Sequence, residues 1–213
     1  MTLLQALSMV LILSTLGLLW IKRIVTAIKI LSAQSLILGL MAILVAHQTG
    51  TVDLYIMGGL TILMKAIGIP WILWFTLRKI GSKRETEKLV GRELSLLCGT
   101  GLLAIGYVVT NRMHISALTI TREYLPISIA MLLIGLFIMM THQKAIMQGI
   151  GLVVMENGLF LVALVTTYGM PFLVDIGVFL DVFVAVILIS MLTYRIDKTF
   201  QSTHTENLRR LRG

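Results

Sequence analysis

Residues 145–168 read AIMQGIGLVVMENGLFLVALVTTY, an apolar run with one carboxylate, Glu156, near its centre. A helix rises by about 1.5 Å per residue, so this run is long enough to cross the roughly 30 Å hydrocarbon core of a bilayer. A charged group at that depth costs roughly 2.5–3.5 kcal/mol on insertion scales, and it therefore usually faces the interior of a helix bundle. The run predicts a membrane helix that packs among others.

Six further apolar runs of similar length accompany it, at about residues 3–20, 24–47, 53–77, 94–110, 124–141 and 171–194. The chain of 213 residues is 57% hydrophobic and 13% charged, whereas soluble domains are about 25% charged. So much apolar surface needs lipid as its solvent. The sequence therefore predicts an all-α, polytopic membrane protein with about seven transmembrane helices.

The basic residues predict the orientation of these helices. Of the 18 lysines and arginines, 15 fall in the segments that are inside if the N-terminus is outside and the C-terminus inside, and only Arg112 and Arg122 fall outside. Such a bias is typical of the positive-inside rule. Because the net charge of +8 lies in short segments between apolar runs, we expect the partner surface to be the lipid bilayer and not nucleic acid. The run at 3–20 is followed by charge and is expected to be a retained first span.

Polar residues at mid-membrane depth predict a site. Counted from the ends of their runs, Lys65, Glu156 and Asp181 lie near the bilayer midplane, with Gln34 at a similar depth and Asn157 beside the carboxyl. Such residues commonly form proton relays. The alternatives are a structural ion pair for Lys65, neutral packing carboxyls for Glu156 and Asp181, and an interhelical hydrogen bond for Gln34.

Three residues are predicted to shape the helices around this layer. Pro70 removes a backbone hydrogen bond to the Ala66 carbonyl and is expected to bend its helix just past Lys65. Gly151 and Gly158 flank Glu156 and allow a neighbouring helix to approach closely or the helix to bend. We expect no metal and no cofactor: the residues show no metal-ligand spacing, phosphate loop or nucleophile motif, and the chain has no predicted catalytic residue.

The second and third runs resemble the sixth and seventh, in parallel orientation. Gln34 then matches Glu156, and Thr61 lies opposite Asp181 with Lys65 one turn beyond. This repeat predicts two three-helix units joined by an extra helix. The expected division is 1–93 for the first unit with its cytoplasmic loop, 94–123 for the linking helix and outer loop, and 124–213 for the second unit with a basic cytoplasmic tail.

Several stretches resemble the hydrogenase-4 component E family, the membrane subunit of group 4 nickel–iron hydrogenases and formate hydrogenlyase-type complexes. They are Ala33-Gln34-Ser35-Leu36, Lys65 followed by Pro70, Met155-Glu156-Asn157-Gly158, Leu173-Val-Asp175-Ile-Gly177, the segment after Asp181, and Asn207-Leu208 with Leu211-Arg-Gly213. The C-terminal half is also similar to the small K subunit of complex I and the C subunit of Na⁺/H⁺ antiporters. Glu156 matches the first of that K subunit's two membrane glutamates, and Asp181 replaces the second only loosely.

The resemblance implies a non-catalytic, proton-relaying subunit in the bacterial or archaeal cytoplasmic (inner) membrane. Its partners would be antiporter-like and anchor membrane subunits of a hydrogenase or complex I-like assembly, whose redox centres lie in other chains. The sequence leaves two alternatives open: a component of a multisubunit cation/proton antiporter, and a structural spacer with fixed ion pairs.

Overall fold

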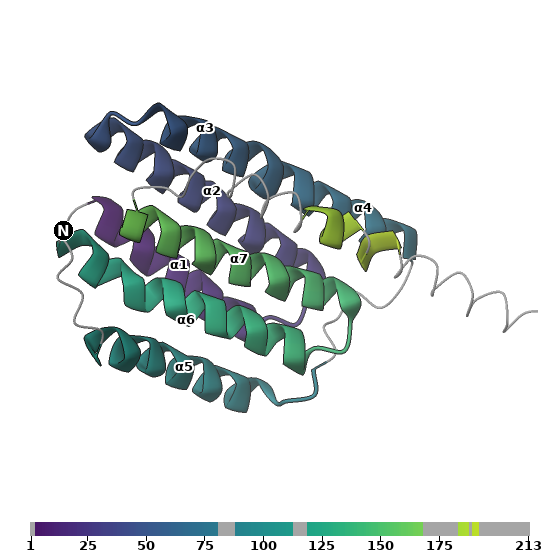
Figure 1. Cartoon of the computed structure of the whole chain (residues 1–213). Coiled ribbons are helices and arrows are strands. Elements are labelled where there is room, and N and C mark those ends of the chain that lie inside the picture. The colour runs from purple at the N-terminus through teal and green to yellow at the C-terminus, as the bar shows by residue number, and fades with distance from the viewer. Residues whose placement is uncertain (1–2, 81–87, 113–118, 168–182, 188, 192–213) are drawn as a thin grey trace, which may run out of the picture.

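The computed structural model describes residues 3–80, 88–112, 119–167, 183–187 and 189–191, and this part of the chain is helical with no strand. Successive long helices run antiparallel to one another (Figure 1). In chain order they are α1 (Leu3–Trp20), α2 (Ile24–Thr49), α3 (Val52–Leu60), the π-helix η1 (Thr61–Gly68), α4 (Ile69–Ile80), α5 (Arg92–Arg112), α6 (Thr119–Thr141) and α7 (Ala145–Thr167).

Within the described residues, six helices are long and apolar enough to cross a bilayer: Leu3–Trp20, Ile24–Thr49, Val52–Arg78, Arg92–Arg112, Tyr124–Thr141 and Ala145–Thr166. These spans confirm the first six predicted runs, and α3, η1 and α4 together form the third of them. Most of the run at 171–194 lies outside the described residues, and the seventh span therefore remains a prediction, as does the orientation in the membrane.

The α6–α7 hairpin is the most closely packed part of the bundle, and glycines make that packing possible. A Cβ atom placed on Gly135 would lie 2.5 Å from the backbone nitrogen of Met155. A Cβ on Gly151 would lie 2.8 Å from the Gly135 carbonyl oxygen, and one on Gly158 would lie 2.7 Å from the nitrogen of Leu132. The two helices therefore touch backbone to backbone on both sides of Glu156.

The α2–α3 hairpin has a similar close approach near its turn. A Cβ on Gly58 would lie 2.9 Å from the carbonyl oxygen of Gly39. Helix α5 packs against α6 and α1 at the edge of the bundle (Figure 1). It leaves much of its surface exposed, as expected for a helix that faces lipid or another protein.

In the part of the chain that the structure describes, two apolar clusters form the core, one in each half of the bundle. The first occupies the end at which α1 finishes and α2 starts, and it includes Leu18, Ile24, Leu31, Leu73, Ile138 and Val154. The second occupies the opposite end and includes Leu11, Leu38, Met41, Met131, Leu161 and Leu164. Along each helix, the residues that separate the two clusters are polar: Thr15, Gln34, Lys65 and Glu156. This polar layer therefore divides the core in two.

Candidate functional site

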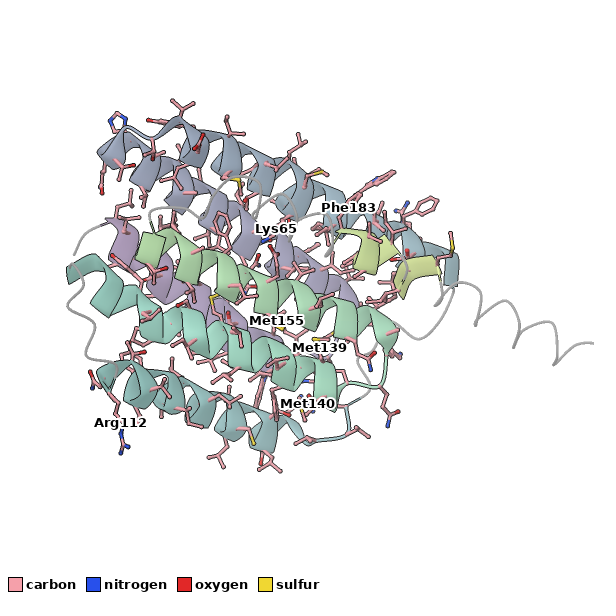
Figure 2. The ribbon with its side chains drawn as sticks, viewed as in Figure 1. Lys65, Arg112, Met139, Met140, Met155 and Phe183 are labelled. Atoms are coloured by element: carbon pink, nitrogen blue, oxygen red, sulfur yellow. The ribbon has the colours of Figure 1, made fainter. Side chains whose placement is uncertain are left out.

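An ion pair lies at the centre of the bundle. Lys65 Nζ of η1 contacts Glu156 Oε2 of α7, and the two residues are 0% and 3% exposed. Lys65 points inward between the helices (Figure 2). Removing two charges from water costs several kcal/mol per ion, and this cost is met only when the pair is close and additional hydrogen bonds are made. The direct contact explains how both charges can be buried here.

Asn157 connects the ion pair to a third helix. Lys65 Nζ donates a 3.2 Å hydrogen bond to Asn157 Oδ1, and Asn157 Nδ2 donates to Ser35 Oγ of α2 at 3.4 Å. The Lys65 ammonium also lies 5.3 Å from the centre of the Phe160 ring, one turn beyond Glu156. Lys65 therefore has a carboxylate, an amide oxygen and an aromatic face around it.

Gln34 extends the polar layer to α1. Its Nε2 atom donates to Thr15 Oγ1 at 2.9 Å and to Ser14 Oγ at 3.0 Å. Gln34 precedes Ser35 in α2, so it lies beside the ion pair's network without bonding directly to Lys65 or Glu156. The predicted layer is therefore present as two adjoining groups, Lys65–Glu156–Asn157–Ser35 and Gln34–Ser14–Thr15.

Three buried polar atoms in this layer have no hydrogen-bond partner within the described part of the chain: Gln34 Oε1, Thr61 Oγ1 and Glu156 Oε2, the last of which is in ion-pair contact with Lys65. Thr61 lies one helical turn before Lys65, and both side chains are fully buried. Buried polar groups are rarely left unsatisfied, and ordered water is a common partner. The layer therefore has hydrogen-bonding capacity beyond its internal contacts.

The helix that carries Lys65 is locally widened. Residues 61–68 form the π-helix, and the N–H of Ile69 bonds to the carbonyl of Met64, five residues earlier. The sequence predicted an irregularity just past Lys65, whereas the π-helix contains this residue. Pro70 has no N–H to donate to the Ala66 carbonyl, and Ser32 Oγ of α2 donates to that oxygen instead, at 2.5 Å.

Several members of the site were not predicted from the sequence. Ser35 holds Asn157, Thr15 and Ser14 hold Gln34, Ser32 holds the Ala66 carbonyl, and Gly135 sets the approach of α6 to α7. The repeat contained one usable signal, because aligning Gln34 with Glu156 also aligns Ser35 with Asn157. Asp181 lies outside the described residues, so its predicted place in the layer remains a prediction.

A second polar cluster lies where the ends of α1 and α6 meet residues 88–90, at the predicted cytoplasmic end. Lys88 Nζ donates to the Leu19 carbonyl near the end of α1, and the Leu89 N–H donates to the Thr141 carbonyl at 2.9 Å. His142 is buried, and its Nδ1 atom is 2.9 Å from the Ile138 carbonyl. A carbonyl can only accept, so Nδ1 carries the hydrogen, and Nε2 has no partner among the described residues.

Burial shifts both ionisable groups of this cluster. It lowers the pKa of Lys88 from its ordinary 10.5, and the nearby positive charge of Arg92 lowers it further. It also lowers the pKa of His142 from 6.5; the Ile138 hydrogen bond opposes the shift and the charge of Lys88 adds to it. Both shifts favour the uncharged form of the side chain.

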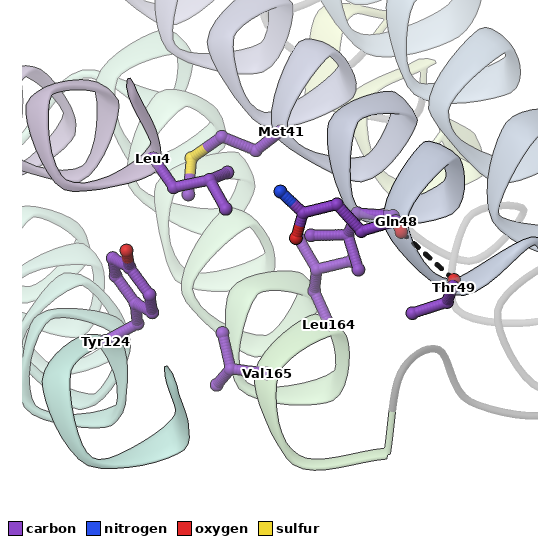
Figure 3. A pocket seen from close by; sticks show the side chains of 8 residues that line it. Leu4, Met41, Gln48, Thr49, Tyr124, Leu164 and Val165 are labelled. Atoms are coloured by element: carbon purple, nitrogen blue, oxygen red, sulfur yellow. Dashed lines mark hydrogen bonds between the residues drawn. The ribbon is translucent and has the colours of Figure 1, made fainter. Parts of the chain in front are cut away.

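A small cavity lies at the opposite end of the bundle, between α1, α2, α6 and α7 (Figure 3). Its volume is about 30 Å³, which is more than the ~10–15 Å³ needed to admit one water molecule. The lining is mostly apolar, and Thr49 on its rim bonds to its own helix at the Val45 carbonyl. No group of three or more His, Cys, Asp or Glu side chains that could hold a metal occurs in the described ranges.

Comparison with curated proteins finds distant relatives. An uncharacterized protein of Mycobacterium tuberculosis is 29% identical over 206 residues, which is 95% of this chain and 92% of the relative. Hydrogenase-4 component E of Escherichia coli K12 is 26% identical over 149 residues, 70% of this chain and 69% of the relative, and the Shigella flexneri protein of that name matches equally. No protein-family model and no solved structure matches the chain. The resemblance to component E is thus supported as a distant similarity, and the likeness to complex I stays a prediction.

Proposed function

We propose that this chain is a non-catalytic membrane subunit of a hydrogenase or related respiratory complex, and that it relays protons at mid-membrane depth. The similarity to hydrogenase-4 component E and the six apolar helices support a membrane subunit of a hydrogenase complex. The observation that carries the relay is the buried Lys65–Glu156 pair with Asn157 attached to it. Its partners would be antiporter-like subunits and a membrane anchor for the soluble arm, and the redox centres would lie in other chains of the complex.

The contacts suggest how one proton could pass. When the Glu156 carboxylate takes up a proton, its charge attraction for Lys65 ends. Lys65 then keeps Asn157 Oδ1 and the Phe160 ring as partners, which hold the ammonium in place without the carboxylate. Loss of the proton restores the pair. A change at a neighbouring subunit that favours one of these two arrangements would thereby load or unload Glu156.

The test is Glu156→Gln in the assembled complex, reconstituted into proteoliposomes, with redox turnover and proton uptake measured together. We expect the number of protons moved per turnover to fall while the subunits still co-purify. Glu93→Gln is a matched control, because Glu93 is an exposed carboxylate in the first turn of α5. Normal pumping at normal turnover in Glu156→Gln would refute the relay.

A structural spacer is the second candidate, and the direct Lys65–Glu156 contact favours it, because a fixed ion pair can hold η1 to α7 without moving a proton. The double variant Lys65→Gln/Glu156→Gln separates the two functions. It removes both charges and so avoids a lone buried ion. A spacer predicts damaged assembly with normal pumping in whatever complex still assembles, whereas the relay predicts assembly without pumping.

A further inference from the structure

Two basic side chains lie close together where α1 ends and α5 begins. Lys88 is half-buried, and Arg92 is exposed at the start of α5. The Lys88 ammonium carries three hydrogens, and the Leu19 carbonyl accepts a hydrogen bond from it. The charge of Arg92 lowers the pKa of Lys88, so the two cations are near enough to repel one another. This repulsion costs free energy, which a bound anion would offset.

No carboxylate of the described residues supplies that anion. Glu93 follows Arg92 on α5 and is exposed, but it forms no ion pair with Lys88 or Arg92. The first N–H groups of α5 have no acceptor within their own helix, and the positive end of the helix dipole adds to the charge of the two side chains. This corner of the bundle is therefore electropositive, and the described part of the chain gives it no counter-charge.

Two tryptophan–arginine contacts indicate that this corner lies at the depth of lipid headgroups. Arg92 Cζ is 5.7 Å from the centre of the Trp20 ring, at the end of α1. Arg78 Cζ is 3.6 Å from the centre of the Trp74 ring, in α4. Successive helices are antiparallel, so α1 and α4 end, and α5 begins, at the same end of the bundle (Figure 1). Both tryptophans are partly exposed, and tryptophan is enriched at the membrane–water interface.

We propose that Lys88, Arg92 and Trp20 form a binding site for the headgroup of one anionic phospholipid. The phosphate lies between the two cations, where the planar guanidinium of Arg92 suits its oxygens. Leu94 and Leu97 of α5 are 54% and 69% exposed and offer apolar surface to the acyl chains. The site is at the end of the bundle, and it does not depend on the proposed relay.

Charge complementarity favours an anionic lipid over the other possible occupants. Basic pockets between membrane helices bind anionic headgroups. A zwitterionic lipid carries its own cation and would leave the repulsion between Lys88 and Arg92 largely in place. A free phosphate ion carries the charge but has no acyl chains to lie against Leu94 and Leu97.

A lipid titration tests the ligand. The full-length chain, purified in detergent and stripped of lipid, receives phosphatidylglycerol while its thermal midpoint is measured. We expect the midpoint to rise, because a ligand that binds only the folded state stabilises it. Phosphatidylcholine and inorganic phosphate should each give a much smaller rise. An equal rise with phosphatidylcholine, an equal rise with inorganic phosphate, or no rise with phosphatidylglycerol would overturn the proposal.

The double variant Lys88→Gln/Arg92→Gln tests the location. One basic residue near the surface is worth roughly fivefold in affinity for anionic lipid, so we expect roughly 25-fold weaker binding of phosphatidylglycerol. Lys29→Gln/Arg78→Gln is the matched control, since it removes the same charge from exposed residues at the same end of the bundle. The control should bind almost as tightly as the unsubstituted chain. Equal losses in both double variants would mean that overall charge alone attracts the lipid, which would overturn the site.

Arg92→Gln alone separates lipid binding from folding, because Lys88 also holds the end of α1 through the Leu19 carbonyl. Arg92 is exposed, so its replacement should leave the midpoint of the lipid-free chain unchanged. Binding of phosphatidylglycerol should weaken roughly fivefold. A lowered lipid-free midpoint with undiminished lipid binding would show that Arg92 only stabilises the fold, and the proposal would fail.

Discussion

The α6–α7 hairpin and the α2–η1 pair each place one member of the ion pair at the centre of the bundle, but they do so in different ways. Glu156 lies on a regular α-helix that touches α6 backbone to backbone through Gly135, Gly151 and Gly158. Lys65 lies in a π-helix. There the Ala66 carbonyl, which Pro70 cannot bond to, accepts a hydrogen bond from the Ser32 hydroxyl. The helix that carries Glu156 is therefore supported more rigidly than the helix that carries Lys65. If the pair separates during function, we expect η1 to move and α7 to stay.

The largest effect should come from leaving one charge of the pair alone. Glu156→Gln takes the carboxylate from the Lys65 ammonium, which keeps Asn157 Oδ1 and the Phe160 ring beside it, and removal of one partner of a buried pair costs roughly 3–5 kcal/mol. We expect a large fall in the thermal midpoint of the detergent-solubilised protein. The double variant Lys65→Gln/Glu156→Gln should recover much of that loss, because no uncompensated charge remains. An unchanged midpoint in Glu156→Gln would show that the pair is not buried as described.

A smaller loss of thermal stability should follow from disturbing the backbone contact between α6 and α7. Gly158→Ala puts a Cβ 2.7 Å from the Leu132 nitrogen and 2.8 Å from the Ser128 carbonyl oxygen. Such overpacking typically costs about 1–3 kcal/mol. Gly59→Ala in α3 meets nothing within 4 Å and should leave stability equal or slightly higher, since alanine favours the helix. Equal thermal midpoints for both variants would mean that α6 and α7 are not packed backbone to backbone.

The support of Lys65 can be tested with a double-mutant cycle. Ser32→Ala leaves the buried Ala66 carbonyl unsatisfied, at a cost of about 1–3 kcal/mol. Pro70→Ala restores an N–H that can bond to the same oxygen. Ser32→Ala should therefore destabilise the protein much less in the Pro70→Ala background than alone. Additive losses in thermal stability would refute the claim that Ser32 substitutes for the hydrogen bond that proline lacks.

The smallest effect should be a pH dependence far from the ion pair. We call the contact of residues 88–90 with the ends of α1 and α6 the junction. Burial in this contact lowers the pKa of His142, so the junction binds a proton less readily when it is formed than when it is broken. No penalty exists above the ordinary value of 6.5, where His142 is neutral in both states, and the junction weakens as pH falls through 6.5. Hydrogen exchange of residues 88–90, corrected for intrinsic rate, should therefore speed up at acidic pH.

The control for this last prediction is His142→Gln, which cannot titrate but can still donate to the Ile138 carbonyl. Its exchange at residues 88–90 should be independent of pH in the same range. A pH dependence of equal size in His142→Gln would exclude the imidazole as its source. In either case the α6–α7 packing should not respond, which separates this junction from the rigid hairpin.

The sequence predicted those features of the fold and site that depend on the residues of one helix alone. Apolar length located the first six spans to within a few residues, and the cost of a buried charge singled out Lys65 and Glu156 by their depth alone. Asn157 followed because it is adjacent to the carboxyl. Each of these predictions depends on local composition or on depth along one helix.

The rest depends on which helices are neighbours, and one sequence does not contain that information. Ser14, Thr15, Ser32 and Ser35 are ordinary residues of apolar helices until α1, η1 and α7 are placed beside α2. The π-helix escaped prediction for a related reason: Pro70 signals a lost hydrogen bond, but the way the preceding turn adapts is decided by whether Ser32 can reach the Ala66 carbonyl.

The division of the apolar core into two halves has an electrical consequence. The membrane voltage falls across the thickness of the hydrocarbon, and moving one elementary charge through all of it takes about 2.3 kcal/mol per 100 mV. Because the polar layer lies at one depth, a charge shifted sideways along it does almost no work against that voltage. The cluster around Leu31 on one side and the cluster around Met41 on the other act as insulation. Under the proposed relay, protons passed along this layer would therefore leave the membrane voltage undischarged.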